Sequence, residues 1–155
     1  MRNTASKILG LEHESLRIVT NEFGKPYLLD YPNFQYNLSH SGCYIAMICG
    51  KNPVGIDIEQ HKEVDVLSLA SLCMTPAEQN TLRALFGPAQ MQYFYDIWTL
   101  KESYVKAVGK GLSLPLESFE VRVSEERMLP RVRLRGTVAA ECGAADEHHG
   151  RSPYH

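Results

Sequence analysis

The sequence lacks the features that identify several large classes of protein. No apolar run in its 155 residues approaches the roughly 20 residues of a membrane-spanning helix, and the start MRNTASKILG has no apolar core typical of a signal peptide. A net charge of −2 gives no general attraction for nucleic acid or membrane surfaces. The four cysteines show no CxxC spacing, which favours reduced thiols. These absences predict a cytoplasmic protein without nucleic-acid or membrane partners.

The residues that are present predict one globular chain that mixes helices and strands. Hydrophobic residues make up 44% of the chain and charged residues 22%, as is usual for a folded domain. The strand at 44–49 is apolar throughout, so we expect both of its faces to be buried. Periodicity and turn residues predict helices over 4–9, 64–73, 75–86 and 90–108, and strands over 16–20, 34–40, 44–49, 54–60 and 119–123, with an edge strand open at 131–135. Thr75 and Glu78 predict a capping box at the start of the third helix, and Gly109 tolerates the left-handed conformation that ends the fourth.

The helix predicted over 90–108 carries charged residues in an unusual place. Lys101 projects into the middle of its apolar face, and Glu102 lies at the edge of that face. One interpretation is structural: the lysine side chain reaches out to solvent, and Glu102 pairs with Lys106 one turn later. The other is that these charges belong to a binding site. The apolar face itself is formed by Phe94, Ile97, Trp98, Val105 and Val108.

The strand predicted over 54–60 presents two carboxylates on one face. Side chains alternate along a strand, so Asp57 and Glu59 share a face at a spacing of roughly 7 Å. Gly55 on the same face leaves room beside them. Like charges this close are unfavourable unless a cation neutralises them, which indicates a metal site. The alternative is an exposed strand face.

Two turns offer groups that could bind an anion. Lys25 is held in an extended conformation by Pro26, because proline disfavours the α region for the residue before it. Ser39 and His40 begin a cluster of small donors at the end of the strand over 34–40, and such a cluster suits phosphate oxygens. The alternatives are a solvated turn lysine and an ordinary turn at the end of a strand.

Together these groups indicate phosphoryl-type chemistry. Three carboxylates suit Mg²⁺, which binds carboxylates together with substrate phosphates and water. Cations nearby could hold the phosphates of a substrate that carries pyrophosphate. The candidate metal ligands are Asp57, Glu59 and Glu102, and the candidate phosphate-binding cations are Lys25, His40, Lys101 and Lys106.

Four motifs in order and spacing give the chain a resemblance to a known family. FGKPYL, FQYNLSHSG, VGIDIEQ and WTLKESYVKAVGKGL, between Ser6 and Val123, resemble the 4′-phosphopantetheinyl transferases of the Sfp type. The resemblance implies Mg²⁺-dependent transfer of 4′-phosphopantetheine from coenzyme A to a serine of an apo acyl or peptidyl carrier protein, with release of 3′,5′-ADP. A shorter, trimeric class of holo-carrier-protein synthases fits less well, because it has neither the Lys-Pro turn nor the Ser-His-Ser cluster placed as here.

The resemblance also implies roles for individual residues. The catalytic residues would be Glu102, which helps to deprotonate the acceptor serine, and Lys106. The Mg²⁺ ligands would be Asp57 and Glu102, with Glu59 as the third. The contacts to coenzyme A would be Lys25, Pro26, Ser39, His40, Lys101 and Lys106.

The fold implied is α+β, with two similar lobes in a pseudo-twofold arrangement and the substrate between them. Residues 1–53 would form a partial first lobe and 54–123 the second lobe. Residues 124–155 are expected to hold an edge strand and a disordered tail, whose Cys142, His148 and His149 could alternatively bind a metal. The resemblance further implies truncation at the N-terminus and divergence after Val123. A catalytically weak remnant that binds coenzyme A or a carrier protein is therefore the alternative to an active transferase.

Overall fold

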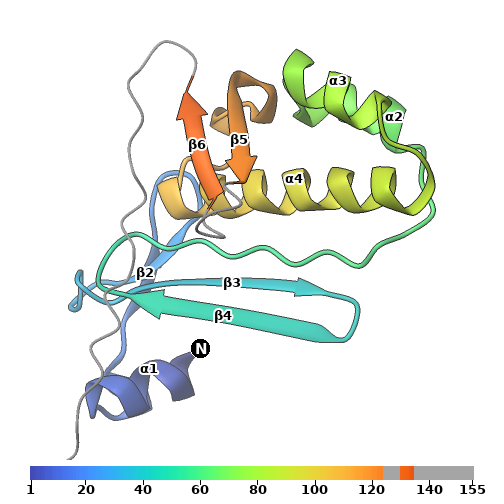
Figure 1. Cartoon of the computed structure of the whole chain (residues 1–155). Coiled ribbons are helices and arrows are strands. Elements are labelled where there is room, and N and C mark those ends of the chain that lie inside the picture. The colour runs from blue at the N-terminus through green and yellow to red at the C-terminus, as the bar shows by residue number, and fades with distance from the viewer. Residues whose placement is uncertain (124–129, 135–155) are drawn as a thin grey trace, which may run out of the picture.

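The computed structural model describes residues 1–123 and 130–134, which mix helices and strands as expected for an α+β protein (Figure 1). The predicted disordered tail and its metal-binding alternative lie outside these residues. The helices are α1 (Arg2–Leu9), α2 (Val66–Cys73), α3 (Pro76–Arg83) and α4 (Gly87–Val108), with short 3₁₀ turns at His13–Ser15, Gly111–Ser113 and Leu116–Ser118. The strands are β1 (Ile18–Thr20), β2 (Pro26–Leu28), β3 (Gln35–Ser41), β4 (Tyr44–Gly50), β5 (Phe119–Val123) and β6 (Pro130–Leu134).

Three antiparallel hairpins account for these strands. Each hairpin is a separate two-stranded sheet, β1 with β2, β3 with β4, and β5 with β6. In the first half of the chain, α1 and the first two hairpins enclose a small core. Its buried members are Ala5, Leu16, Leu28, Phe34 and Tyr36.

The second half of the chain forms a larger core around α4. Helices α2 and α3 and strand β5 pack against one side of α4, and the predicted capping box of Thr75 and Glu78 at the start of α3 is confirmed (Figure 1). Gly109 ends α4 in the left-handed conformation, which glycine adopts without steric cost. The buried members of this core are Val66, Ala70, Cys73, Met74, Leu82, Phe94, Tyr95, Ile97, Val105, Phe119 and Val121.

Residues 54–60, in the segment that joins the two halves, were predicted wrongly as a strand. Residues 54–65 cross the molecule between the β3–β4 hairpin and α4, but they form no backbone ladder with either neighbour (Figure 1). At its far end the segment is held by Tyr95, whose hydroxyl accepts the Lys62 amide at 3.0 Å and whose ring stacks on His61. Residues 54–65 thus form an extended segment that lies along α4, the bridging segment.

Strand β4 is more exposed than its apolar sequence predicted. Its side chains Tyr44 and Ile45 are 74% and 78% exposed, and Ile48 is also exposed. Among the described residues β4 pairs with β3 alone, so its outer edge and much of its surface have no neighbouring layer. The expectation that both faces are buried is therefore wrong for this structure. No helix of the described residues is long and apolar enough to cross a membrane.

Candidate functional site

Side chains of β3, not its backbone, hold the bridging segment in place. Asn37 Oδ1 accepts the amide of Ile56 at 3.0 Å, and Ser39 Oγ accepts the amide of Ile58 at 3.3 Å. Ser41 Oγ repeats the contact with the amide of Gln60 at 2.9 Å. The constant separation of the partners makes the two segments parallel and fixes their register. Because side chains alternate along both segments, two of these residues, Ser39 and Ser41, also donate to the carboxylates of this stretch.

Asp57 lies at the centre of this arrangement. Its Oδ1 accepts hydrogen bonds from Ser39 Oγ at 2.9 Å and from Lys106 Nζ at 2.6 Å. Ser39 Oγ also lies 3.1 Å from Lys106 Nζ, so its single hydroxyl serves three partners. The Asp57 side chain is 4% exposed, and its Oδ2 is buried without a hydrogen-bond donor among the described residues. A buried carboxylate oxygen in this state is an acceptor available to a cation.

Gly55 lets the bridging segment lie directly on α4. A Cβ at this position would come within 1.9 Å of the Ser103 carbonyl oxygen and 2.4 Å of the Ala107 amide nitrogen. Both are backbone atoms of a helix and cannot turn aside. The absence of a side chain at Gly55 therefore brings Asp57 within reach of Lys106 on α4.

Glu102 faces the same region from α4, one turn before Lys106. Burial raises the pKa of Glu102, and the nearby carboxylate of Asp57, with a smaller effect of Glu59, raises it further, whereas Lys106 opposes the shift. The predicted pair between Glu102 and Lys106 is not formed as a close contact, because Lys106 pairs with Asp57. Glu59 is exposed and accepts a hydrogen bond from Ser41 Oγ at 3.2 Å.

Lys25 is brought to the site by the turn between β1 and β2. Its Nζ donates to the carbonyl oxygens of Ala107 at 2.7 Å and Val54 at 3.2 Å, and burial lowers its pKa. Asn21 of the same turn donates to the carbonyl of Gly109 at 2.9 Å. The turn thus binds the C-terminal end of α4, where backbone carbonyls favour a cation.

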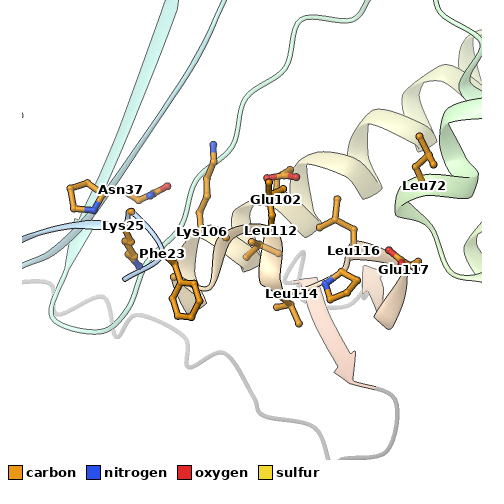
Figure 2. A pocket seen from close by; sticks show the side chains of 16 residues that line it. Phe23, Lys25, Asn37, Leu72, Glu102, Lys106, Leu112, Leu114, Leu116 and Glu117 are labelled. Carbon is orange, nitrogen blue, oxygen red and sulfur yellow. The ribbon is translucent and has the colours of Figure 1, made fainter. Parts of the chain in front are cut away.

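A cavity of about 480 Å³ adjoins these groups. Figure 2 shows Lys25 and Asn37 at one end, Lys106 and Glu102 along α4, and Leu72 toward the other end. Pro26 also lines it, and further apolar walls come from Leu112, Leu114 and Leu116. The cavity therefore joins a charged end to an apolar end, as a ligand with an anionic group and a less polar arm requires.

Two of the predicted site residues are not gathered here. Lys101 was expected to contact phosphates, but its side chain has no exposed surface and its ammonium points into the core formed by α2, α3 and β5. That expectation disagrees with the structure, because the carboxylate of Glu78 and three carbonyls already surround the charge. His40 is exposed and alternates with Ser39 on β3, so it faces away from Asp57.

The predicted carboxylates are chemically suited to bind a divalent cation, but they are not gathered around one point. Residues 1–123 and 130–134 contain no group of three or more His, Cys, Asp or Glu side chains gathered as a metal site. Asp57 nevertheless keeps one buried oxygen without a donor, and burial, with the nearby Asp57 carboxylate, raises the pKa of Glu102. Hard oxygen donors of this kind suit Mg²⁺, and Asp57 with Glu102 would be the first to hold it.

Sequence reasoning missed the part that β3 plays. Asn37 was not singled out, and Ser41 was noted only as part of the Ser-His-Ser cluster, although both flank Ser39 at a spacing of two residues. Small polar side chains at three alternate positions of the strand were the available signal, since such a stripe must find partners when it is buried. Asn37 and Ser39 are both buried in the structure.

The raised pKa of Glu102 gives a testable pH dependence. The folded protein holds a proton on Glu102 at pH values where the unfolded chain, with an ordinary pKa of 4.5, has lost it. Stability therefore falls as pH rises from 4.5 through the folded pKa, and the loss is complete above it. We expect Glu102→Gln to raise the melting temperature at pH 7 by a few degrees and to leave it unchanged near pH 4.

Melting followed by the fluorescence of Trp98, the chain's single tryptophan, in buffer with a chelator would measure this difference. Glu117→Gln is the matched control, because Glu117 lines the same cavity but is exposed. A Glu102→Gln protein that is no more stable than the parent at pH 7 would contradict the electrostatic explanation.

The sequence is similar to proteins of one enzyme family. Residues 53–152 match the model of the 4′-phosphopantetheinyl transferase superfamily, and this match continues past Val123, where the motif resemblance ended. A 4′-phosphopantetheinyl transferase from Bacillus subtilis is 40% identical over 126 residues, which cover 81% of this chain and 56% of the relative. A 4′-phosphopantetheinyl transferase from Aneurinibacillus migulanus is 34% identical over 119 residues, covering 77% and 49%.

A more distant similarity extends to vertebrates. The mouse L-aminoadipate-semialdehyde dehydrogenase-phosphopantetheinyl transferase is 30% identical over 141 residues, which cover 83% of this chain and 46% of the mouse protein. The chain thus spans about half the length of the curated relatives it matches.

Proposed function

The chain belongs to the 4′-phosphopantetheinyl transferase superfamily, with relatives of the Sfp type, and we propose that it transfers 4′-phosphopantetheine from coenzyme A to a serine of an apo carrier protein. The products would be the holo carrier protein and 3′,5′-ADP. The acceptor would be an acyl or peptidyl carrier protein, and the cytoplasm is the compartment we propose for the reaction.

One observation carries this proposal. Asp57 and Lys106 form a close pair at 2.6 Å, and Glu102 and Lys106 line the cavity of about 480 Å³. These three residues come from the two motifs, VGIDIEQ and WTLKESYVKAVGKGL, that carry the family resemblance most specifically. Glu102 and Lys106 supply a base and a cation at the cavity, and Asp57 adds a carboxylate beside Lys106; transfer of a phosphoryl-type group requires such groups.

The chemistry assigned to these residues is a displacement at phosphorus. The serine oxygen forms a bond to the phosphorus that bears the pantetheine arm, and the bond from that phosphorus to the oxygen of 3′,5′-ADP breaks. Glu102 takes the serine proton, and its raised pKa makes it a better base than an ordinary glutamate. Lys106 binds the phosphate oxygens and offsets the negative charge that develops on them.

We propose Mg²⁺ as the cofactor, held by Asp57 and Glu102 with Glu59 as a third ligand. When bound, the ion would neutralise pyrophosphate charge and orient the phosphates. The partnerless Oδ2 of Asp57 supports this role, because a buried carboxylate oxygen without a donor is otherwise costly. The chain itself holds Asp57 in place through Ser39 and through the close approach at Gly55.

The remaining assignments follow the family resemblance. We propose Lys25 and Pro26 as coenzyme A contacts because both line the cavity. Ser39 and His40 remain proposed contacts, and Ser39 also holds Asp57. We also propose that residues 1–53 and 54–123 are parts of two lobes in pseudo-twofold arrangement, which the two separate hydrophobic cores support.

A second candidate is a protein that binds coenzyme A or a carrier protein without efficient turnover. The specific observation that favours it is the ion pair of Lys106 with Asp57. In that arrangement Lys106 neutralises the carboxylate that the transferase would use for the metal, and Lys106 must move before it can bind phosphate oxygens.

The test is incubation of the protein with coenzyme A, Mg²⁺ and purified apo acyl or peptidyl carrier proteins, followed by intact mass spectrometry. We expect the carrier to gain the mass of one phosphopantetheine group, because the groups needed for transfer adjoin one cavity. A carrier whose acceptor serine is replaced by alanine is the control and should gain no mass. Calorimetric binding of coenzyme A without any mass gain would favour the second candidate and contradict the transferase.

A further inference from the structure

Lys101 is a fully buried cation that the proposed chemistry does not use. Its side chain has 0% exposure, and its Nζ lies 2.6 Å from Glu78 Oε2. The ammonium also donates to the carbonyl oxygens of Cys73 at 2.9 Å and of Leu116 and Phe119, both at 2.8 Å. Its charge further lies 5.1 Å from the centroid of the Phe119 ring. Every proton of the ammonium therefore has an acceptor inside the core.

Glu78 is equally enclosed. It is 2% exposed, and its Oε2 accepts the Thr75 amide at 2.7 Å in the capping box of α3. Its Oε1 accepts the amide of Val121 in β5 at 2.9 Å. Burial lowers the pKa of Lys101, and the carboxylate of Glu78 opposes that shift. Two opposite charges thus meet in the core with their hydrogen-bonding capacity used.

The pair connects segments that are far apart in the sequence. Through it α4 is joined to the end of α2, the start of α3, the 3₁₀ turn at Leu116–Ser118 and β5. Consecutive side chains on a helix point about 100° apart, so an inward Lys101 directs Glu102 to a different side of α4. That side is the one that lines the cavity, where Figure 2 shows Glu102 and Lys106.

We propose that the buried Lys101–Glu78 pair is a positioning device that sets the rotation of α4 and thereby places Glu102 and Lys106 at the cavity. Lys101 acts through the helix that it anchors and does not touch the substrate. Only the predicted effect of the pair on turnover depends on the proposed function. Its predicted effects on unfolding and on hydrogen exchange of the α4 amides do not depend on that function.

The test is a double-mutant cycle with Lys101→Met, Glu78→Gln and the double variant. Methionine keeps the length of the lysine side chain, and glutamine keeps the shape of the glutamate. Lys110→Met is the matched control, because Lys110 is exposed just beyond α4, and Lys106→Met is the comparator at the cavity. Each protein is measured for urea unfolding, for hydrogen exchange of the α4 amides, and for kcat and the KM of coenzyme A.

Lys101→Met should lower the folding equilibrium constant by roughly a hundredfold or more, because it leaves the Glu78 carboxylate buried without its cation. Glu78→Gln should be milder, since three carbonyls still accept from the ammonium, and the double variant should recover part of the loss. Amides of α4 should exchange faster in both single variants but not in Lys110→Met. Where transfer occurs, kcat should fall at least about tenfold, with a smaller rise in the KM of coenzyme A than in Lys106→Met, because Glu102 and Lys106 are displaced but Lys106 is still present and Lys101 touches no substrate.

Other outcomes would overturn the proposal. A Lys101→Met protein with unchanged stability and a raised KM for coenzyme A would indicate that Lys101 contacts phosphate. Lys106→Met is expected to raise the KM in this way, because Lys106 is the proposed phosphate contact. Strict additivity in the cycle would show that the two charges do not act as a pair. Should Lys101→Met fail to fold, Glu78→Gln decides: wild-type unfolding, exchange and kcat in that variant would refute the proposal. A parent protein without transfer would refute the proposed function alone, and the folding and exchange data would still decide on the pair.

Discussion

Replacement of Asp57 by asparagine is expected to reduce carrier-protein modification by at least about a hundredfold, because the metal that its carboxylate would hold supplies several kcal/mol of charge stabilisation. Asparagine keeps the shape of the side chain, so its oxygen can still accept from Ser39 and Lys106. The fold should therefore remain. The change removes the negative charge and replaces one carboxylate oxygen, the partnerless Oδ2, by an amide donor at the residue on which the site is centred.

The measurement is the rate of mass gain by an apo carrier protein at saturating coenzyme A and Mg²⁺, with an unfolding curve for each variant. Asp96→Asn is the matched control, since Asp96 is an exposed aspartate on α4 and should transfer like the parent. A titration of Mg²⁺ adds a second readout: Asp57→Asn should need more metal for half of its remaining rate. Near-parental transfer by a folded Asp57→Asn protein would remove Asp57 from the proposed metal site.

The elements predicted well from the sequence are those with local causes. The capping box of Thr75 and Glu78 and the left-handed Gly109 depend on neighbouring backbone atoms, and both are where the sequence indicated. The hairpin of β3 and β4 also follows from alternation and an intervening turn. Such signals need no knowledge of the rest of the fold.

The parts of the site that escaped prediction depend on distant partners. Lys106 was expected beside Glu102 one turn away, but Asp57 competes for it from 49 residues earlier in the chain. Lys101 was expected to reach solvent or to contact phosphates, and nothing local identifies Glu78 as its partner in the core. Pairing across the fold is decided by tertiary packing, which periodicity does not record.

The bridging segment illustrates the same limit at the level of the backbone. Alternation over Val54–Gln60 predicted a strand, and the segment is extended, but its amides meet side chains of β3 instead of backbone carbonyls. Side chains between two backbones hold them further apart than the spacing of about 4.8 Å within a sheet. A pattern of alternating residues cannot distinguish these two kinds of neighbour. Asp57 and Glu59 nevertheless lie on the same side of the segment, because Ser39 and Ser41 of one strand contact them.

Replacement of Gly55 by alanine is expected to disrupt both the fold and the site. The added methyl group would meet two backbone atoms of α4, at 1.9 Å and 2.4 Å, so the bridging segment must move away from the helix. Forcing a methyl group into such a contact costs typically about 1–3 kcal/mol of stability. Asp57 lies two residues later, so it would move away from Lys106. A displacement of about 1 Å at a catalytic site lowers the rate roughly a hundredfold.

Gly50→Ala provides the matched control for this prediction. Gly50 also lacks a left-handed φ, and its added Cβ would make only ordinary contact, at 3.5 Å from Val54 Cγ1. Both variants add the same methyl group and restrict the unfolded chain to the same degree, so their difference isolates the contact with α4. We expect the Gly50→Ala protein to melt and transfer like the parent, and the Gly55→Ala protein to melt at a lower temperature and to transfer at roughly a hundredth of the rate or less. Equal melting temperatures and rates for the two variants would show that the bridging segment does not rest on α4 as described, and the placement of Asp57 beside Lys106 would fail with it.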